Sequence, residues 1–257
     1  MTVITAVAGP PGIGKTTWIR QQLASSTQPV VYFSPGNTAV PIDQTALAAE
    51  LTTIQTLSDG QESELIENLV AGTSTYIELG FHLDLEAMNP LLDAVFSRRV
   101  AIVPPGTKDS QWHQWASEIV EGIAVETSVE KAQLWRANTS GQVIDLASLN
   151  VFWYELTEGA YGKVYRAKGI FDGVDGRAFY FDFVAGIPES VFSELNVYRW
   201  LEGRPQRFSG LEVLGIELDE KAIAQTLKDC CLDDSAIAYY QKQIKEQSLE
   251  NSEEVIS

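Results

Sequence analysis

Cysteine and histidine are almost absent from this chain of 257 residues. Its only cysteines are the adjacent pair Cys230 and Cys231, and its only histidines are His82 and His113. Two neighbouring cysteines provide no disulfide framework, and such sparse cysteine is typical of a reducing compartment, so a cytoplasmic location is expected. The pair could bind a soft metal, but adjacent residues on one helix point in different directions, which favours an ordinary half-buried helix position.

Long apolar runs are also missing. No run approaches the roughly 20 apolar residues that a membrane-spanning helix requires. The first residues lack the basic segment followed by an apolar one that marks a signal peptide. A membrane is therefore not expected among the partners of this chain.

Basic residues are few compared with acidic ones. Eighteen lysines and arginines stand against 35 aspartates and glutamates, which gives a formal net charge of −17. A surface of this sign repels the phosphates of nucleic acids and of anionic lipids, so nucleic acid is not an expected partner. A nucleotide is still compatible with this charge, because a phosphate-binding loop acts through local N–H groups and a single lysine.

The start of the chain carries a phosphate-binding motif with the flanks that the motif requires. Residues 3–8 are a short β-branched apolar run, as in a buried parallel strand, and Ile19 and Leu23 have the spacing of one helical face. Between them the sequence fits Gly-x-x-x-x-Gly-Lys-Thr. The residues expected to bind phosphate are Gly9, Pro10, Pro11, Gly12, Ile13, Gly14, Lys15, Thr16 and Thr17.

The chemistry of this motif follows from its residue types. Glycines permit positive φ angles, so the backbone N–H groups can converge on phosphates at the positive end of the following helix. Lys15 is expected to reach the β- and γ-phosphates and to act in catalysis, and the Thr16 hydroxyl is expected to ligate Mg²⁺. A glycine-rich turn that binds nothing is the alternative, and the complete motif disfavours it.

Two carboxylates are candidate partners for Mg²⁺. Asp43 follows a predicted strand at 29–34 and a turn-rich segment; it could approach the metal, or it could cap a helix at 44–52, and both interpretations stay open. Glu78 ends a predicted strand at 74–80. A carboxylate at the carboxyl end of a parallel strand faces the ligand crevice, where Glu78 could hold Mg²⁺ through water or orient the attacking water. An ordinary acid at a strand end is the alternative.

The order of elements predicts an α/β fold for the first part of the chain. Further strands are expected at 99–103 and 122–126, and further helices at 61–71 and 111–120. Short strands that alternate with helices are typical of a parallel sheet with helices on both faces. The predicted P-loop nucleotide-binding domain spans 1–148.

After about residue 148 the sequence becomes richer in aromatic and β-branched runs, which predicts a smaller α+β domain over 149–232. The residues 173–176 suit a hairpin connection, and Asp219 suits the cap of a helix. Residues 233–257 are expected to form an acidic helical or disordered tail. The runs that suggest strands lie at 151–154, 162–171, 178–184 and 211–216.

Taken together, these motifs resemble the CobW-type GTPases, a group of P-loop proteins many of which are linked to metal insertion or metal homeostasis. The similar segments are 3–23, the switch-like end at 41–43, the acidic motif at 78–80, an Arg-Ala-Lys-Gly strand within 165–169, and the closing strand at 211–215 with the helix after Asp219. The resemblance implies Mg²⁺-dependent binding and hydrolysis of a nucleoside triphosphate, GTP more than ATP, in the service of a protein partner. Slow hydrolysis is expected because the switch segment has no obvious arginine finger.

The chain also departs from that family. The Cys-x-Cys-Cys metal motif would fall between Asp43 and Glu78, where this chain has no cysteine, so no thiolate metal site is expected there. The Asn-Glu pair of the first switch is replaced by residues 34–37, and the acidic motif is one residue short. The guanine-reading Asn-Lys-x-Asp is missing, because the nearest match at 106–109 breaks its spacing. A nucleotide-binding regulatory or scaffold module without hydrolysis is therefore the alternative function.

Overall fold

The computed structural model of the chain describes residues 4–24, 26, 28–36, 39–125, 131–188 and 191–254. The chain divides into two compact units, Met1–Ser128 and Val129–Ser257. Among the described residues, no helix has the length and apolar character needed to cross a bilayer.

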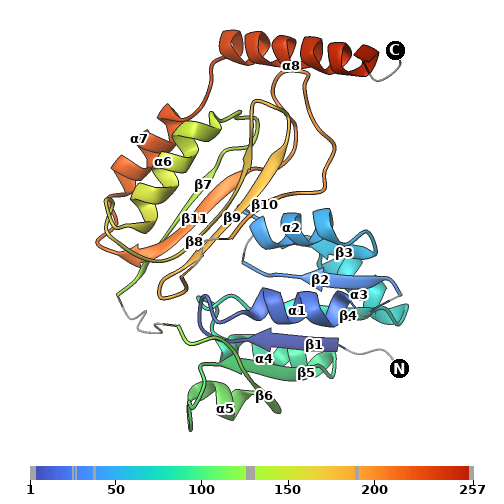
Figure 1. Cartoon of the computed structure of the whole chain (residues 1–257). Coiled ribbons are helices and arrows are strands. Elements are labelled where there is room, and N and C mark those ends of the chain that lie inside the picture. Colours follow the sequence, from blue (N-terminus) through green and yellow to red (C-terminus); the bar gives the residue numbers. More distant parts are fainter. Residues whose placement is uncertain are drawn as a thin grey trace. The chain divides into compact units, whose positions relative to one another are not determined.

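A six-stranded parallel sheet forms the first unit (Figure 1). The strands follow the order β3-β2-β4-β1-β5-β6, and every pair of neighbours is parallel. Parallel neighbours need crossover connections. Along the chain from β1 to β5, each pair of successive strands is connected through one helix. The strands are β1 (Ile4–Ala8), β2 (Val30–Phe33), β3 (Ile54–Leu57), β4 (Ser74–Glu78), β5 (Arg98–Val103) and β6 (Glu118–Glu121).

Helices cover both faces of this sheet, because successive strand residues point to opposite sides. Val7 packs in one core cluster with residues of α1 (Lys15–Ala24) and α2 (Ile42–Glu50). Ala6 and Ala8 pack in another with residues of α3 (Glu62–Val70) and α4 (Leu85–Ala94), to which the short α5 (Gln111–Trp115) adds two tryptophans. The predicted α/β fold, a P-loop-type parallel sheet with helices on both faces, is confirmed.

The second unit contains a smaller, antiparallel sheet of order β10-β9-β8-β11-β7. Helices α6 (Leu146–Thr157) and α7 (Glu220–Asp229) lie on one face of it, where they bury an aromatic and aliphatic core. Helix α8 (Asp234–Glu254) follows (Figure 1). The α+β character predicted for this part is confirmed. The strands are β7 (Gln133–Asn138), β8 (Lys163–Asp172), β9 (Ala178–Val184), β10 (Val191–Glu194) and β11 (Gly210–Ile216).

Several local predictions differ from the structure. Residues 151–154 lie in α6 rather than in a strand, because Leu149, Phe152 and Leu156 recur at helical spacing and are buried together. The helix expected at 111–120 ends at Trp115, and the last strand is β6 instead of 122–126. Of that segment Glu126 lies outside the described residues, as does Val3 of the first strand.

The division between the units falls earlier than the boundary expected after residue 148. Strand β7 pairs with β11 and is therefore an edge strand of the second sheet. Two predictions about the second unit's turns are confirmed. The Gly176 N–H donates to the Gly173 carbonyl at 3.0 Å in the hairpin, and the Asp219 side chain accepts from the Ala222 N–H to cap α7.

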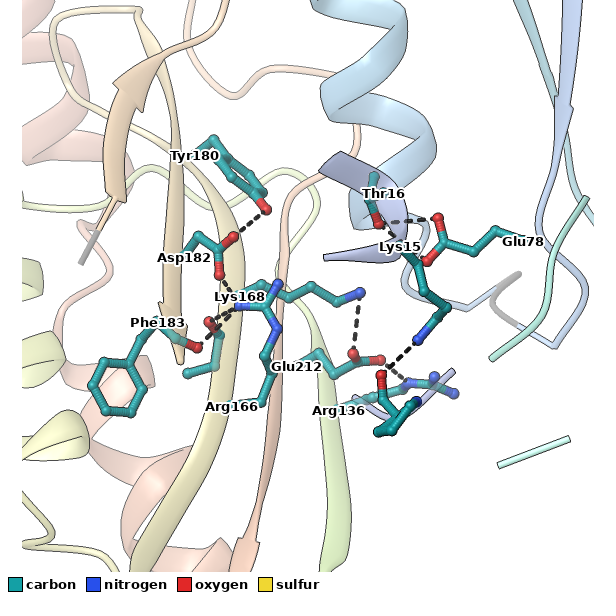
Figure 2. Close-up of polar contacts among 12 residues, drawn as sticks. Lys15, Thr16, Glu78, Arg136, Arg166, Lys168, Tyr180, Asp182, Phe183 and Glu212 are labelled. Atoms are coloured by element: carbon teal, nitrogen blue, oxygen red, sulfur yellow. Dashed lines mark hydrogen bonds and ion pairs between the residues drawn. The ribbon is translucent and has the colours of Figure 1, made fainter. Parts of the chain in front are cut away.

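The Arg-Ala-Lys-Gly segment of β8 has a structural explanation. Arg166 pairs with Asp182 and also donates to the Phe183 carbonyl at 3.0 Å, as Figure 2 shows. Ala167 lies in the core beneath α6 and α7. A side chain on Gly169 would place its Cβ 2.6 Å from the Phe171 ring. Each member of the segment is thus used in building the second sheet.

Lys168 belongs to an ionic network on the polar face of that sheet (Figure 2). Glu212 stands directly opposite both Lys168 and Arg136 in the strand register. Its carboxylate oxygens lie 2.6 Å from Arg136 Nε and 3.3 Å from Lys168 Nζ, and the residue is only 8% exposed. Burial alone would raise the pKa of Glu212, but Lys168 and Arg136 outweigh it and lower the pKa to about 2.

We expect Glu212→Gln to reduce the free energy of unfolding at pH 7 by about 3 kcal/mol, because it leaves two part-buried cations without their carboxylate. A lowered pKa stabilises the fold above the ordinary value of 4.5, and this contribution is lost as the pH falls toward 2. Urea unfolding of the variant and the wild type should therefore differ most at pH 7, differ less near pH 3, and converge as the pH falls through about 2. The exposed Glu202→Gln is the control, and a deficit independent of pH would contradict the assignment.

Candidate functional site

The expected phosphate loop lies between β1 and α1 and has the backbone conformation that its glycines permit. Gly9, Gly12 and Gly14 have φ angles of 153°, 74° and 99°. Gly9 also passes close to the neighbouring strand β5, so that a Cβ there would lie 2.3 Å from the Ile102 carbonyl oxygen. Only glycine fits this approach. The buried Ile13 anchors the middle of the loop in the core of the first unit.

Lys15 is the first residue of α1, and its side chain reaches back across the loop. Its ammonium group donates to the carbonyl oxygens of Gly9 and Pro10, each at 3.0 Å. The residue is 8% exposed. The one full positive charge of the loop is therefore placed beside its backbone, where three donors of the ammonium group can be shared between carbonyls and a phosphate.

Thr16 and Glu78 lie together, although 62 positions separate them in the sequence (Figure 2). The Thr16 hydroxyl is 3.1 Å from Glu78 Oε1 and 3.0 Å from Oε2. The contact follows from the sheet, because β1 and β4 are neighbours and Val7 stands opposite Glu78 in their register. The hydroxyl and the carboxylate that were both predicted to hold Mg²⁺ thus meet at the edge of the loop.

A third residue of this group, Tyr32, was not expected from the sequence. It lies on β2 with 0% exposure, and its hydroxyl donates to Glu78 Oε2 at 2.8 Å. Burial, followed by the charges of Glu78 and Asp43, raises the pKa of Tyr32 well above its ordinary value of 10.0. The hydroxyl therefore stays protonated and remains a donor. A tyrosine in an otherwise apolar strand was the available signal, since a buried hydroxyl needs a partner.

Asp43 lies in the first turn of α2 and is 7% exposed. Of its two open interpretations, the helix cap is wrong, because the helix begins at Ile42 and Pro41 occupies the cap position. The charge of Asp43 acts on the Tyr32 hydroxyl that binds Glu78. The second candidate carboxylate is therefore in the electrostatic neighbourhood of the first.

These residues lie where the connections of the sheet change direction. From β1 the chain crosses over one face to β2, whereas from β4, the neighbour of β1, it crosses the other face to β5 on the opposite side (Figure 1). In open α/β sheets a ligand crevice forms at the carboxyl ends of strands at such a switch point. The loop follows the carboxyl end of β1, and Glu78 is the last residue of β4.

Polar side chains of the loop after β4 make local contacts. Asp84 caps α4 by accepting from the Glu86 N–H at 2.9 Å, and Glu86 is exposed. The ring of His82 instead packs over backbone, because a Cβ on Gly80 would lie 2.5 Å from His82 Cε1 and one on Gly36 would lie 2.8 Å from Nε2. No group of three histidine, cysteine, aspartate or glutamate side chains suited to a metal occurs within the described ranges.

The cysteine pair is placed at the end of α7. Cys230 is buried, and burial raises the pKa of its thiol to about 11. Cys231 donates to the Leu227 carbonyl at 3.4 Å. Both are protonated thiols in the packing of the second unit at neutral pH.

Asn37, which belongs to the altered switch segment, lies outside the described residues.

No protein-family model matches the chain, and no curated protein matches it. Two solved structures are similar to the chain: a Zn(II)-bound YjiA GTPase from E. coli, at 14% identity, and a Zn(II)-bound triple mutant of YjiA GTPase, at 12% identity. Each likeness covers 89% of this chain and 98% of the other, with a TM-score of 0.34. Since likeness at this level carries no argument about activity, the functional proposal depends on the site itself.

Proposed function

We propose that the first unit binds a nucleoside triphosphate together with Mg²⁺ and hydrolyses it slowly, with GTP favoured modestly over ATP, as a switch protein that serves a partner protein in metal homeostasis. The proposal of nucleotide binding rests on one observation: Thr16, within a complete phosphate loop, is hydrogen-bonded to the carboxylate of Glu78. A glycine-rich turn without a ligand would have no need of a buried carboxylate bonded to its threonine. The partner and the metal process rest on the sequence resemblance alone.

Each residue of the loop has a role in this proposal. The backbone N–H groups of the non-proline residues within Gly9–Thr17 surround the phosphates, and the N-terminus of α1 adds its positive end. Lys15 contacts the β- and γ-phosphates as a catalytic point charge. The Thr16 hydroxyl ligates Mg²⁺, with Glu78 and Asp43 as further candidate ligands, either directly or through water.

The donors present fit Mg²⁺. This ion prefers hard oxygen ligands and is usually held by one or two carboxylates, a hydroxyl, waters and substrate phosphates. A hydroxyl from Thr16 and carboxylates from Glu78 and Asp43 are such a set, and none of them is a thiolate. When bound, Mg²⁺ would neutralise charge that develops on the phosphates.

Hydrolysis requires an oriented water and a neutralised transition state. Glu78 is the carboxylate fixed beside Thr16, so it is the group that would orient the attacking water. The switch segment at 34–43 has no arginine. An absent arginine finger lowers the rate by about 10³- to 10⁵-fold, which is why slow turnover is proposed.

A nucleotide-binding module without hydrolysis is the second candidate. It is favoured by the engagement of Glu78, whose carboxylate accepts bonds from two hydroxyls, Thr16 and Tyr32. A carboxylate held in this way can stabilise a metal without ever activating a water. In that case triphosphate would bind and persist.

Competition between labelled GTP and ATP, combined with single-turnover hydrolysis in Mg²⁺, tests the proposal. We expect binding of both nucleotides, slow hydrolysis, and a GTP preference below roughly 10²-fold, because the element that hydrogen-bonds guanine is degenerate. A stronger preference would identify 106–109 or another segment as the base reader. Binding without turnover would establish the second candidate, and absence of triphosphate binding would refute both.

A further inference from the structure

We propose that Tyr32 is a positioning residue that fixes the carboxylate of Glu78 for its work on the metal-bound triphosphate. This inference rests on the proposed function and deepens it, since it assigns to the same site a residue outside the phosphate loop. It concerns the orientation of Glu78, whereas the proposed function concerns binding and turnover as such.

The Glu78 carboxylate is contacted by two hydroxyl groups, those of Thr16 and Tyr32, in different ways. Thr16 Oγ1 lies at nearly equal distances, 3.0 and 3.1 Å, from the two oxygens of Glu78. One hydroxyl proton is directed at one oxygen at a time, so the Thr16 contact does not distinguish Oε1 from Oε2. Tyr32 donates to Oε2 alone, and at 2.8 Å it is the shorter contact. Tyr32 therefore selects one orientation.

The two hydroxyl donors to Glu78 belong to different parts of the first unit. Thr16 lies in the loop that would contact the ligand, at the start of α1. Tyr32 is held in the centre of the sheet, opposite Thr56 of β3 and Tyr76 of β4, and its ring packs in the core with Val7 and Leu47. A functional group is placed accurately when its support is itself locked by packing. Tyr32 provides that support from the rigid part of the unit.

The rate of hydrolysis should depend on how accurately the Glu78 carboxylate is placed. In-line hydrolysis is sensitive to placement, and a shift of about 1 Å can lower a rate by about 10²-fold. Without the tyrosine hydroxyl, Glu78 keeps its contact with Thr16, whose hydroxyl lies close to both carboxylate oxygens and is also the proposed ligand of Mg²⁺. The carboxylate would then sample more than one orientation when the metal and the triphosphate are bound.

Tyr32→Phe removes only the hydroxyl and keeps the packing of the ring. We expect single-turnover hydrolysis to fall roughly 10- to 100-fold, while triphosphate affinity without Mg²⁺ stays within about 2-fold of the wild type. The increase in affinity for a non-hydrolysable triphosphate that Mg²⁺ produces, measured by calorimetry, should become smaller. Tyr76→Phe is the matched control, because Tyr76 stands opposite Tyr32 on β4 and its ring contacts Trp18; it should behave as the wild type.

A double-mutant cycle between Tyr32→Phe and Glu78→Gln separates positioning from mere stability. In urea unfolding of the ligand-free chain, the two changes should be non-additive, which tests the contact without any nucleotide. In the Glu78→Gln background, Tyr32→Phe should cause no further loss of rate. Additive unfolding effects would overturn the contact. Wild-type rate and Mg²⁺ response in Tyr32→Phe would overturn the positioning role, even if the unfolding effects are coupled.

Failure of the proposed function is seen in a different experiment. It would be recorded in the wild type as an absence of triphosphate binding, whereas failure of the present inference is recorded as equality of Tyr32→Phe and wild type. If Tyr32→Phe does not fold, Tyr32→Met replaces it. This change also removes the hydroxyl, fills the core with a flexible apolar side chain, and should reproduce the loss of rate and of Mg²⁺ response.

Discussion

Lys15→Ala is expected to abolish tight triphosphate binding and to leave the first unit folded. The variant removes the one full positive charge of the loop, which we expect to make charge-assisted hydrogen bonds to the β- and γ-phosphates. Two such bonds at about 1.5–3 kcal/mol each correspond to a loss of roughly 10²- to 10⁴-fold in affinity. The fold should persist because the loop is held by Ile13 and by the close approach of Gly9 to β5.

Calorimetry with GTP and with ATP in Mg²⁺ measures this effect, and circular dichroism confirms folding. Lys108→Ala is the control, since Lys108 is exposed and is the other lysine of residues 1–128. It should leave ATP affinity unchanged. A loss confined to GTP in the control would reveal a guanine contact at 106–109. Unchanged triphosphate affinity in Lys15→Ala would disprove the assignment of the phosphate site.

Glu78→Gln is expected to lower the rate of hydrolysis about 10²- to 10⁴-fold, with much smaller effects on binding. The amide is nearly the same size as the carboxylate and still offers one acceptor oxygen to Thr16 and Tyr32. It lacks the negative charge that would orient and polarise the attacking water. The effect should therefore appear in the single-turnover rate rather than in the affinity.

The control for this variant is Glu86→Gln, which removes an exposed acid from the first turn of α4. It should hydrolyse triphosphate at the wild-type rate. Fast turnover that is insensitive to Glu78 would place the catalytic group elsewhere in the chain. Equal losses in both variants would indicate that the general acidity of this loop, and not one carboxylate, affects the reaction.

Much of the site was predictable because its chemistry is local. Gly9 through Thr17 are contiguous, and their glycines, lysine and threonine define the loop without any knowledge of the fold. Glu78 was predictable as the acid at the end of a strand. Its contact with Thr16 depends on β4 being the neighbour of β1, and strand order is a property of the whole sheet that no local pattern contains.

The residues and elements that the sequence did not predict were missed for physical reasons, such as dependence on strand order or on burial. The hydroxyl of Tyr32 in an apolar strand indicates a buried partner, but the identity of that partner is not defined until β2 is placed beside β4. Helix α4 contains Pro90, which normally ends a helix, so 85–94 lacked a clear helical pattern. Strand β3 is four residues long and lies at the sheet edge. In α6, aromatic residues that favour strands were overridden by a helical spacing that buries one face.

The position of β1 between β4 and β5 has a consequence for the synthesis of the chain. Strand β1 has partners that are made much later in synthesis, since Ile4 pairs with Thr75 and Thr5 with Arg98. The glycine at the entrance of the loop also rests against Ile102 of β5. A nascent chain that stops before β5 therefore contains the complete phosphate-binding sequence but lacks the strand that helps to fix the conformation of the loop. Affinity for phosphate should arise late and abruptly, when residues up to Val103 have emerged and the sheet closes around β1.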